Sequence, residues 1–216
     1  MDASAATVVL LRDGASGVEV LLAERPSDRG SFAGAWVFPG GAVDEADAGE
    51  DPIDSEPAAR RAAVRETFEE VGLGLEPAEL VGFALWSPPE GVPKRMRTRF
   101  FAARAPEGEP VLAADELVSA AWMRPEEALE RHAAGDLTLY PPTWVTLHGL
   151  IGAASVDSVL STLREAGEQS YVGRFGDDRR VLYWREDAAF VDDAAEGGPR
   201  HRLVMHGLPW VYERSS

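Results

Sequence analysis

The chain has 216 residues, of which 45% are hydrophobic, and a formal net charge of −16. So acidic a protein is a poor binder of nucleic acid polymers, which require a basic face. The absence of cysteine excludes disulfides, thiolate metal sites and a cysteine nucleophile. Neither a membrane-spanning apolar run nor the basic start of a signal peptide is visible, so we expect a cytoplasmic protein that does not bind membranes.

The first third of the chain predicts strands followed by an acidic loop. Residues 7–12 and 18–25 are apolar and β-branched and flank a glycine-containing turn, which is typical of a hairpin. Residues 35–41 predict a short strand that Pro39 and two glycines interrupt. Residues 44–56 are rich in acids without an apolar period, and we expect an exposed loop there, with an extra cation site as the alternative.

A helix is predicted next, with clear signals at both ends. Ser55 is a candidate N-cap, Pro57 suits the first turn, and Gly72 suits the position after a helix that ends near Val71. The remaining chain predicts strands in 79–89, 95–105 and 117–123, helices in 124–135, 143–154 and 156–168, and further strands in 179–186 and 201–214. This mixed order predicts a layered α/β or α+β domain.

Three glutamates lie close together on the helix that ends near Val71. At 100° per residue Glu66, Glu69 and Glu70 share one face, whereas Val64, Phe68 and Val71 share the opposite one. We therefore expect the apolar residues to dock on the core and the acids to point outward. Clustered carboxylates are the ligands that Mg²⁺ prefers, although a solvated acidic face is the commoner explanation.

The glycines of "FPGG" (residues 38–41) and the block "RETFEEVGL" (residues 65–73) together resemble the Nudix box, G-x5-E-x7-R-E-U-x-E-E-x-G-U. Gly41 matches its first glycine, and Thr67 replaces the bulky apolar residue of the pattern. The pattern places its arginine fourteen residues after that glycine, at position 55, and the observed arginine is at 65, so ten residues are inserted. The middle glutamate of the pattern then has three candidate counterparts: Asp44, Glu50 and Glu56.

The resemblance implies an α/β/α sandwich around a mixed sheet, with extra C-terminal helices and strands here. It also implies Mg²⁺- or Mn²⁺-dependent cleavage of a small-molecule diphosphate. By the same resemblance Glu66, Glu69 and Glu70 would hold the metal, the Gly41 region would offer a backbone carbonyl, and Arg65 would brace the glutamates. Glu66 is the first candidate for the general base and Glu116 the second, since Glu116 resembles an acid that precedes the last core strand in this family.

A second resemblance indicates which substrate to expect. Residues 21–41 partly match the signature of coenzyme A pyrophosphatases, with Arg25, Gly34 and Phe38–Gly41 in place, but Ala23, Pro26 and Gly30 depart from it. We therefore expect coenzyme A or its thioesters first. ADP-ribose, dinucleotides, nucleoside triphosphates and a non-catalytic nucleotide-binding domain stay open as alternatives.

Further substrate contacts are predicted on one strand and one tryptophan. Arg97 and Arg99, with Arg95 and Lys94 beside them, alternate on the strand in 95–105 and so share a face that phosphates would fit. A charged strand edge or partners for the acidic loop would explain them equally well. Trp86 precedes a Pro/Gly loop and is a candidate to stack on a base.

The expected organisation is a hydrolase domain over residues 1–170 followed by a strand-rich tail over 171–216. The tail would pack on the same domain or on a partner subunit. Members of the resembled family are often homodimers, so a homodimer is a further expectation.

Overall fold

The computed structural model describes residues 3–28, 32–92, 95–193, 195 and 197–215. In these residues the strands join in one mixed sheet with the order β11-β10-β9-β8-β5-β6-β1-β2-β3, while β4 pairs with β1 and β7 with β2. The strands are β1 (Ala3–Gly14), β2 (Gly17–Glu24), β3 (Trp36–Val37), β4 (Gly40–Ala42), β5 (Val81–Ser87), β6 (Met96–Arg104), β7 (Ser119–Met123), β8 (Gln169–Phe175), β9 (Val181–Trp184), β10 (His201–Val204) and β11 (Val211–Arg214).

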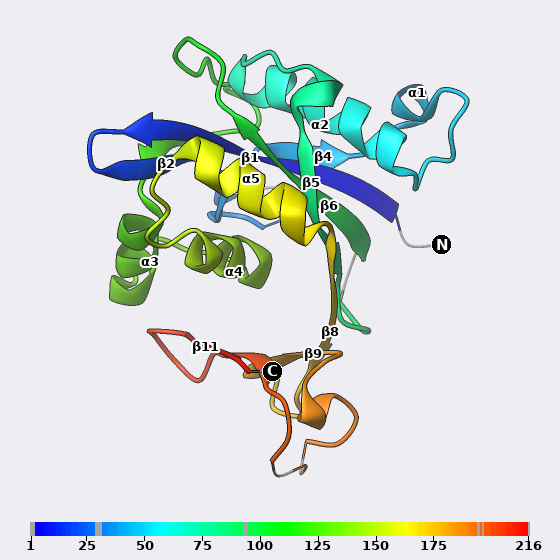
Figure 1. Ribbon diagram of the computed structural model, residues 1–216, viewed down its shortest axis with the longest axis vertical. Helices are drawn as coiled ribbons and strands as arrows, with labels where there is room; N and C mark the ends of the chain where they lie inside the picture. Colours follow the sequence, from blue (N-terminus) through cyan, green and yellow to red (C-terminus); the bar gives the residue numbers. More distant parts are fainter. Residues whose placement is uncertain (1–2, 29–31, 93–94, 194, 196, 216) are drawn as a thin grey trace.

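The helices cover both faces of this sheet, as Figure 1 shows, with α2 on one face and α5 on the other. They are α1 (Glu45–Ala48), α2 (Glu56–Val71), α3 (Pro125–Ala134), α4 (Pro141–Gly149) and α5 (Val156–Ala166), with short 3-10 helices at Pro77–Glu79 and Ala188–Phe190. This is the mixed α+β sandwich that the sequence predicted. None of the helices in the described part of the chain combines the length and apolarity that crossing a membrane requires.

The alternation of β1 divides the core into two layers. Val8 and Leu10 point into a cluster shared with the alanines of α2, whereas Val9 and Leu11 point into a cluster shared with α4 and α5. All four side chains are at most 1% exposed. Successive residues of a strand face opposite sides, so β1 is an apolar run buried on both faces.

The ends of α2 follow the sequence signals. The Ser55 hydroxyl oxygen accepts a hydrogen bond from the amide of Ala58, and such a cap contributes about 1 kcal/mol. At the other end Gly72 adopts a left-handed conformation with φ of 69°, and its N–H donates to the carbonyl of Phe68. The predicted bounds of this helix are therefore confirmed.

The predicted rotation of α2 is only partly correct: Val71 is buried and Val64 packs against the core as expected, but Phe68 and Glu70 do not lie as predicted. Phe68 is 62% exposed, whereas Thr67 is fully buried and Glu70 is only 2% exposed. The face against the sheet is built from Ala58, Ala59, Ala62 and Ala63, whose small side chains allow close packing. The buried Thr67 hydroxyl donates to the carbonyl of Ala63, which satisfies it within the helix.

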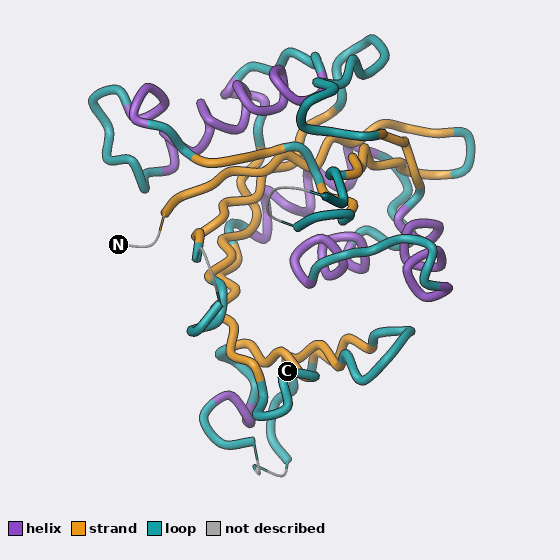
Figure 2. Tube along the Cα trace, turned by 180° about the vertical axis from the view of Figure 1, so that it is seen from behind, coloured by secondary structure: helices purple, strands orange, loops and turns teal. Residues whose placement is uncertain are grey.

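The C-terminal strands extend the sheet beyond the α-helical layers. β8 pairs in parallel with β5 and then antiparallel with β9, so it spans the expected boundary at residue 170. The segment 201–214 forms two strands, β10 and β11, joined by a turn. Figure 2 shows this row of strands beneath the helices. Trp210, which directly precedes β11, connects these strands to the helices through ring contacts with His132 of α3 and Trp144 of α4.

Candidate active site

Glu70 is the buried carboxylate of the site. Its Oε2 accepts a hydrogen bond of 2.8 Å from the amide of Gly40, and its Oε1 lies 3.6 Å from a guanidinium nitrogen of Arg25. Burial raises the pKa of Glu70 to about 7, against the opposing effects of the Gly40 amide and Arg25. A carboxylate held this way is costly unless a cation offsets its charge.

Glu66 lies one turn earlier, over the glycine pair. A Cβ on Gly41 would come within 2.4 Å of the Glu66 carboxyl carbon, so any larger residue would displace the Glu66 carboxylate from this position. Gly40 is equally constrained, since its φ is 154° and a Cβ would meet the carbonyl oxygen of Ala6 at 2.3 Å. Burial also raises the pKa of Glu66, and the charges of Glu69 and Glu116 add to that, while Arg65 opposes it.

Arg65 holds the acidic cluster together. One of its terminal nitrogens donates to Glu66 at 2.9 Å and to Glu69 at 2.8 Å. The other donates to Asp47 at 2.8 Å and to the carbonyl of Ala42 at 3.0 Å. The guanidinium thus ties α2 to β4 and α1, which is the bracing that the resemblance implied.

Asp47 was missed by the sequence reasoning. The expected exposed loop contains the single-turn helix α1, in which Asp47 is 5% exposed and accepts from the Asp44 amide at 2.9 Å. An acid three residues after another acid is a capping pattern, and this signal would have found the turn. Arg61 and Arg65, rather than the arginines of β6, pair with the acids of this stretch.

Glu116 lies near the same cluster. It sits in the turn before β7 and is exposed, and its charge raises the pKa of both Glu66 and Glu70. The amide of Ala113 in the same turn donates to the carbonyl of Glu70 at 3.0 Å, which fixes the turn against the end of α2. The two candidates for the general base are therefore neighbours.

The donor set suits a hard divalent cation. It consists of oxygens only: the carboxylates of Glu66, Glu69 and Glu70 beside the backbone of the Gly40–Gly41 turn. In the described residues no three acidic or histidine side chains already converge on one point as ligands. Arg65 binds one oxygen each of Glu66 and Glu69, so a cation would be held through the other oxygens after small side-chain rotations.

An open cleft of about 430 Å³ lies beside this cluster. Its walls are the segment that follows Arg25 and the turn around Glu116, and its lining residues are Pro26, Ser27, Asp28, Leu112, Ala114, Leu117 and Val118. Arg25, which directly precedes the cleft-lining segment in the chain, contacts Glu70. Of the coenzyme A signature, Arg29 and Gly30 lie outside the described residues, as does Lys94 of the basic strand.

Arg97 and Arg99 are on β6, on the other side of β1 from β4. Arg99 pairs in register with Ala6, whose other neighbour is Gly41, so two strand spacings separate Arg99 from the glycine turn. The Arg99 side chain forms an ion pair of 2.6 Å with Glu168, whereas Arg97 is exposed. The structure therefore does not bring this pair into the carboxylate cluster.

Trp86 is also separate from the cluster. It is 6% exposed and lines a cavity on the face of the sheet opposite α2. One face of its ring is stacked on Tyr171 with centroids 4.0 Å apart. Stacking on a base at that face would require Tyr171 to move.

Comparison with known proteins identifies the family. The model of the NUDIX domain matches residues 1–142. A NUDIX hydrolase from Alicyclobacillus acidocaldarius is 28% identical with a TM-score of 0.67, over 76% of this chain and 97% of that one.

Two more distant structures share the fold. A MutT NUDIX hydrolase from Burkholderia pseudomallei is 23% identical with a TM-score of 0.52, over 68% of this chain and 97% of that one. The NUDIX domain of Shewanella oneidensis NrtR, solved with ADP ribose, is 14% identical with a TM-score of 0.52, over 68% of this chain and 85% of that one. The chain belongs to the NUDIX domain family and is a hydrolase that acts on phosphoric anhydride bonds.

Proposed function

We propose that the protein is a Mg²⁺- or Mn²⁺-dependent pyrophosphohydrolase of a nucleoside diphosphate linked to a second group, with coenzyme A or an acyl-coenzyme A as the first substrate. The observation that carries the proposal is the buried Glu70 carboxylate, held by the Gly40 amide beside Glu66 and the charge of Glu116. Carboxylates this close repel one another, and a divalent cation that also binds a phosphate would offset that repulsion.

The roles of the residues follow from their positions. Glu66, Glu69 and Glu70 would hold the metal. The metal would offset the negative charge of the diphosphate and lower the pKa of a water molecule, which could then lose a proton and attack as hydroxide. Glu66 is our first candidate to accept the proton of that water, and Glu116 is the second because it is exposed beside it. Arg25 contacts Glu70 and directly precedes the cleft-lining segment in the chain, so its guanidinium would position a phosphate.

Coenzyme A is favoured by the partial signature in residues 21–41, and the open cleft after Arg25 leaves space for the group linked to the diphosphate. ADP-ribose, dinucleotides and nucleoside triphosphates are the alternatives within the same chemistry. The cytoplasmic location and the homodimer remain predictions.

The test is a substrate panel with product analysis. The wild type, Glu70→Gln and Glu56→Gln would be incubated with Mg²⁺ or Mn²⁺ and coenzyme A, acetyl-coenzyme A, ADP-ribose, NADH or nucleoside triphosphates. We expect 3′,5′-ADP and 4′-phosphopantetheine from coenzyme A with the wild type and Glu56→Gln only. Glu56 is the matched control because it pairs with Arg60 at the far end of α2.

Two outcomes would change the proposal in different ways. Cleavage of another panel member with the same dependence on Glu70 would keep the metal site and reject coenzyme A. Equal activity of the Glu70→Gln variant would reject the assigned site itself.

A further inference from the structure

The cavity that contains Trp86 is separate from the carboxylate site. It has a volume of about 190 Å³ and lies between the sheet and helices α4 and α5, on the face opposite α2. β11 reaches its rim through Arg214. Nothing in the chemistry assigned to Glu66, Glu69 and Glu70 uses this space.

Most of the wall is apolar and comes from elements on either side. Val9, Leu11 and Ala84 contribute from the sheet, and Leu150 and Leu163 from the helices. Gly149, the last residue of α4, also lines it, and a Cβ there would meet no atom within 4 Å. A ligand with a small apolar body therefore has room: an apolar cavity of about 150 Å³ is enough for a benzene ring.

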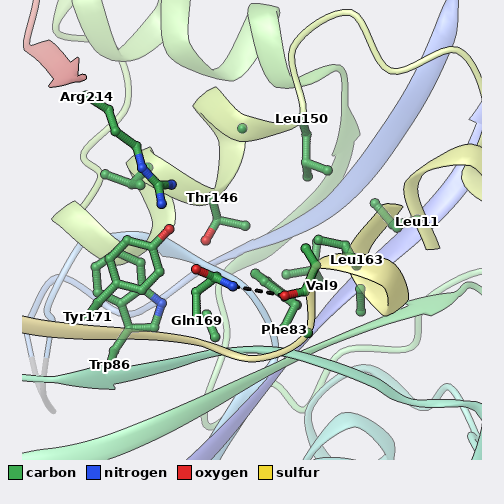
Figure 3. A pocket seen from close by; sticks show the side chains of 16 residues that line it. Val9, Leu11, Phe83, Trp86, Thr146, Leu150, Leu163, Gln169, Tyr171 and Arg214 are labelled. Atoms are coloured by element: carbon green, nitrogen blue, oxygen red, sulfur yellow. Dashed lines mark hydrogen bonds between the residues drawn. The ribbon is translucent and has the colours of Figure 1, made fainter. Parts of the chain in front are cut away.

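Two of the polar side chains at the cavity, Trp86 and Arg214, can only donate hydrogen bonds. The indole Nε1–H of Trp86 is buried and finds no partner in the part of the chain that the structure describes. In Figure 3 this nitrogen lies on the side of the ring that faces Gln169, and the guanidinium of Arg214 lies beside the Tyr171 hydroxyl. The Gln169 amide nitrogen donates to the carbonyl of Ala166.

A buried donor without a partner is destabilising, so a ligand with an acceptor at this position would be favoured. An acceptor with a negative charge would also be attracted by Arg214 at the rim. The apolar wall of the cavity favours a ligand whose remaining atoms are apolar. We infer that this cavity binds a small apolar monocarboxylate, whose carboxylate accepts from Trp86 Nε1–H near Arg214 and whose body fills the space between the sheet and helices α4 and α5.

The test observes Trp86 itself. The indole ¹⁵N–¹H signals would be recorded while sodium benzoate is added to roughly 10 mM, because so small a ligand is expected to bind in the micromolar to millimolar range. The Trp86→Phe variant assigns the signal. Trp122 is the internal control, since its indole nitrogen is also buried without a partner among the described residues but does not line the cavity.

We expect a saturable shift of the Trp86 signal and none of the Trp122 signal. Gly149→Leu, which places a large side chain at the exposed rim of the cavity, should weaken benzoate binding by calorimetry at least about tenfold, whereas Gly149→Ala should change it little. Arg214→Gln should weaken it about threefold to fivefold, since the guanidinium is exposed. Glu70→Gln should bind benzoate like the wild type, which separates this site from the hydrolase site.

Three results would overturn the inference. The first is an unmoved Trp86 signal in a folded wild type. The second is full benzoate binding by a folded Gly149→Leu variant. The third is a shift of the Trp86 signal with adenosine but not with benzoate, which would make the cavity a nucleoside pocket.

Discussion

Glu70 is held in a position that costs stability. Its carboxylate is buried, with the Gly40 amide and Arg25 as partial compensation, and its pKa is raised to about 7. Glutamine has the same shape and keeps an oxygen to accept from Gly40, but carries no charge. Glu70→Gln should therefore remove function without removing the fold.

For Glu70→Gln we expect kcat/KM to fall by about 10²–10³-fold, while the free energy of unfolding in urea at pH 7.5 stays equal or rises by about 1–2 kcal/mol. Activity assays and chemical denaturation check the two halves. A variant that loses several kcal/mol would show that the carboxylate is structural.

Arg65 has more partners than a lysine could serve. Its guanidinium reaches Asp47, Glu66, Glu69 and the carbonyl of Ala42 at once. Arg65→Lys keeps the charge but loses the planar fork. We expect about a tenfold lower kcat/KM and a weaker apparent affinity for Mg²⁺, measured by metal titration of activity. Unchanged metal dependence would mean that Arg65 does not position the glutamates.

Several residues of the candidate site were predicted correctly from the sequence. The glutamates, the glycine pair and the bracing arginine do meet, because each depends on local spacing along one helix and one turn. Asp47 was predictable from local spacing as well, since it lies three residues after Asp44 and six after Gly41; its contact with Arg65, 18 residues away, was not. The sequence suggests that Trp86 stacks on a nucleotide base. It cannot show that Tyr171, far along the chain, already covers one face of the Trp86 ring.

At the scale of elements, α2 shows the limit of helical periodicity. Its ends were predictable from Ser55 and Gly72, but its rotation was only partly so. Most of the buried face consists of alanines, which give a weak apolar signal, with Thr67, Glu70 and Val71 buried at its end, so Phe68 weighed in the pattern although it is 62% exposed.

Substitutions on α2 test this rotation. Phe68→Ser should change the free energy of unfolding by less than about 0.5 kcal/mol, since the side chain is largely solvated. Ala62→Leu should cost about 1–3 kcal/mol, because it forces a larger side chain against the sheet. Thermal and urea unfolding measure both. A large loss from Phe68→Ser would restore the rotation that the sequence suggested.

The C-terminal strands depend on a buried ion pair. Asp187 is 4% exposed and accepts hydrogen bonds from Arg202, at 2.7 Å, and from the amides of His201 and Ala189. Burial alone would raise the pKa of Asp187, but these partners outweigh it and the pKa is lowered. The stabilisation is thus present above the ordinary aspartate pKa and is lost as the pH falls below about 4.

Asp187→Ala should cost about 3–5 kcal/mol, since it leaves Arg202 without its buried partner. Fluorescence of Trp184 and Trp210 between pH 7 and 3 would show the tail loosening in the wild type only at the acid end. In the variant we expect the tail to be loosened already at pH 7. A variant with a wild-type acid transition would rule out this role.

For the whole molecule, the sheet separates two sites of different character. The acidic cluster and its open cleft lie with α2, and the apolar cavity lies on the opposite face. The family match ends at residue 142, and α5 and the strands β8 to β11, which follow it, help build the second face. The pairing of β8 with β5 joins distant segments, which no local pattern in the sequence reveals.

Net charge acts on the molecule as a whole. With 37 acidic and 21 basic residues, repulsion between the excess carboxylates opposes the compact state. Raising NaCl from about 10 to 150 mM screens that repulsion, and we expect the Tm to rise by a few degrees in calorimetry. A falling Tm would show that ion pairs such as those of Arg65 outweigh the repulsion.

The most direct test of the central claim is the binding of Mn²⁺ to the wild type, Glu66→Gln, Glu70→Gln and Glu56→Gln, followed by electron paramagnetic resonance of the free ion. We expect saturable binding by the wild type and Glu56→Gln, with affinity at least about tenfold weaker in the other two variants. Equal affinity in all four folded proteins would contradict a metal site on α2.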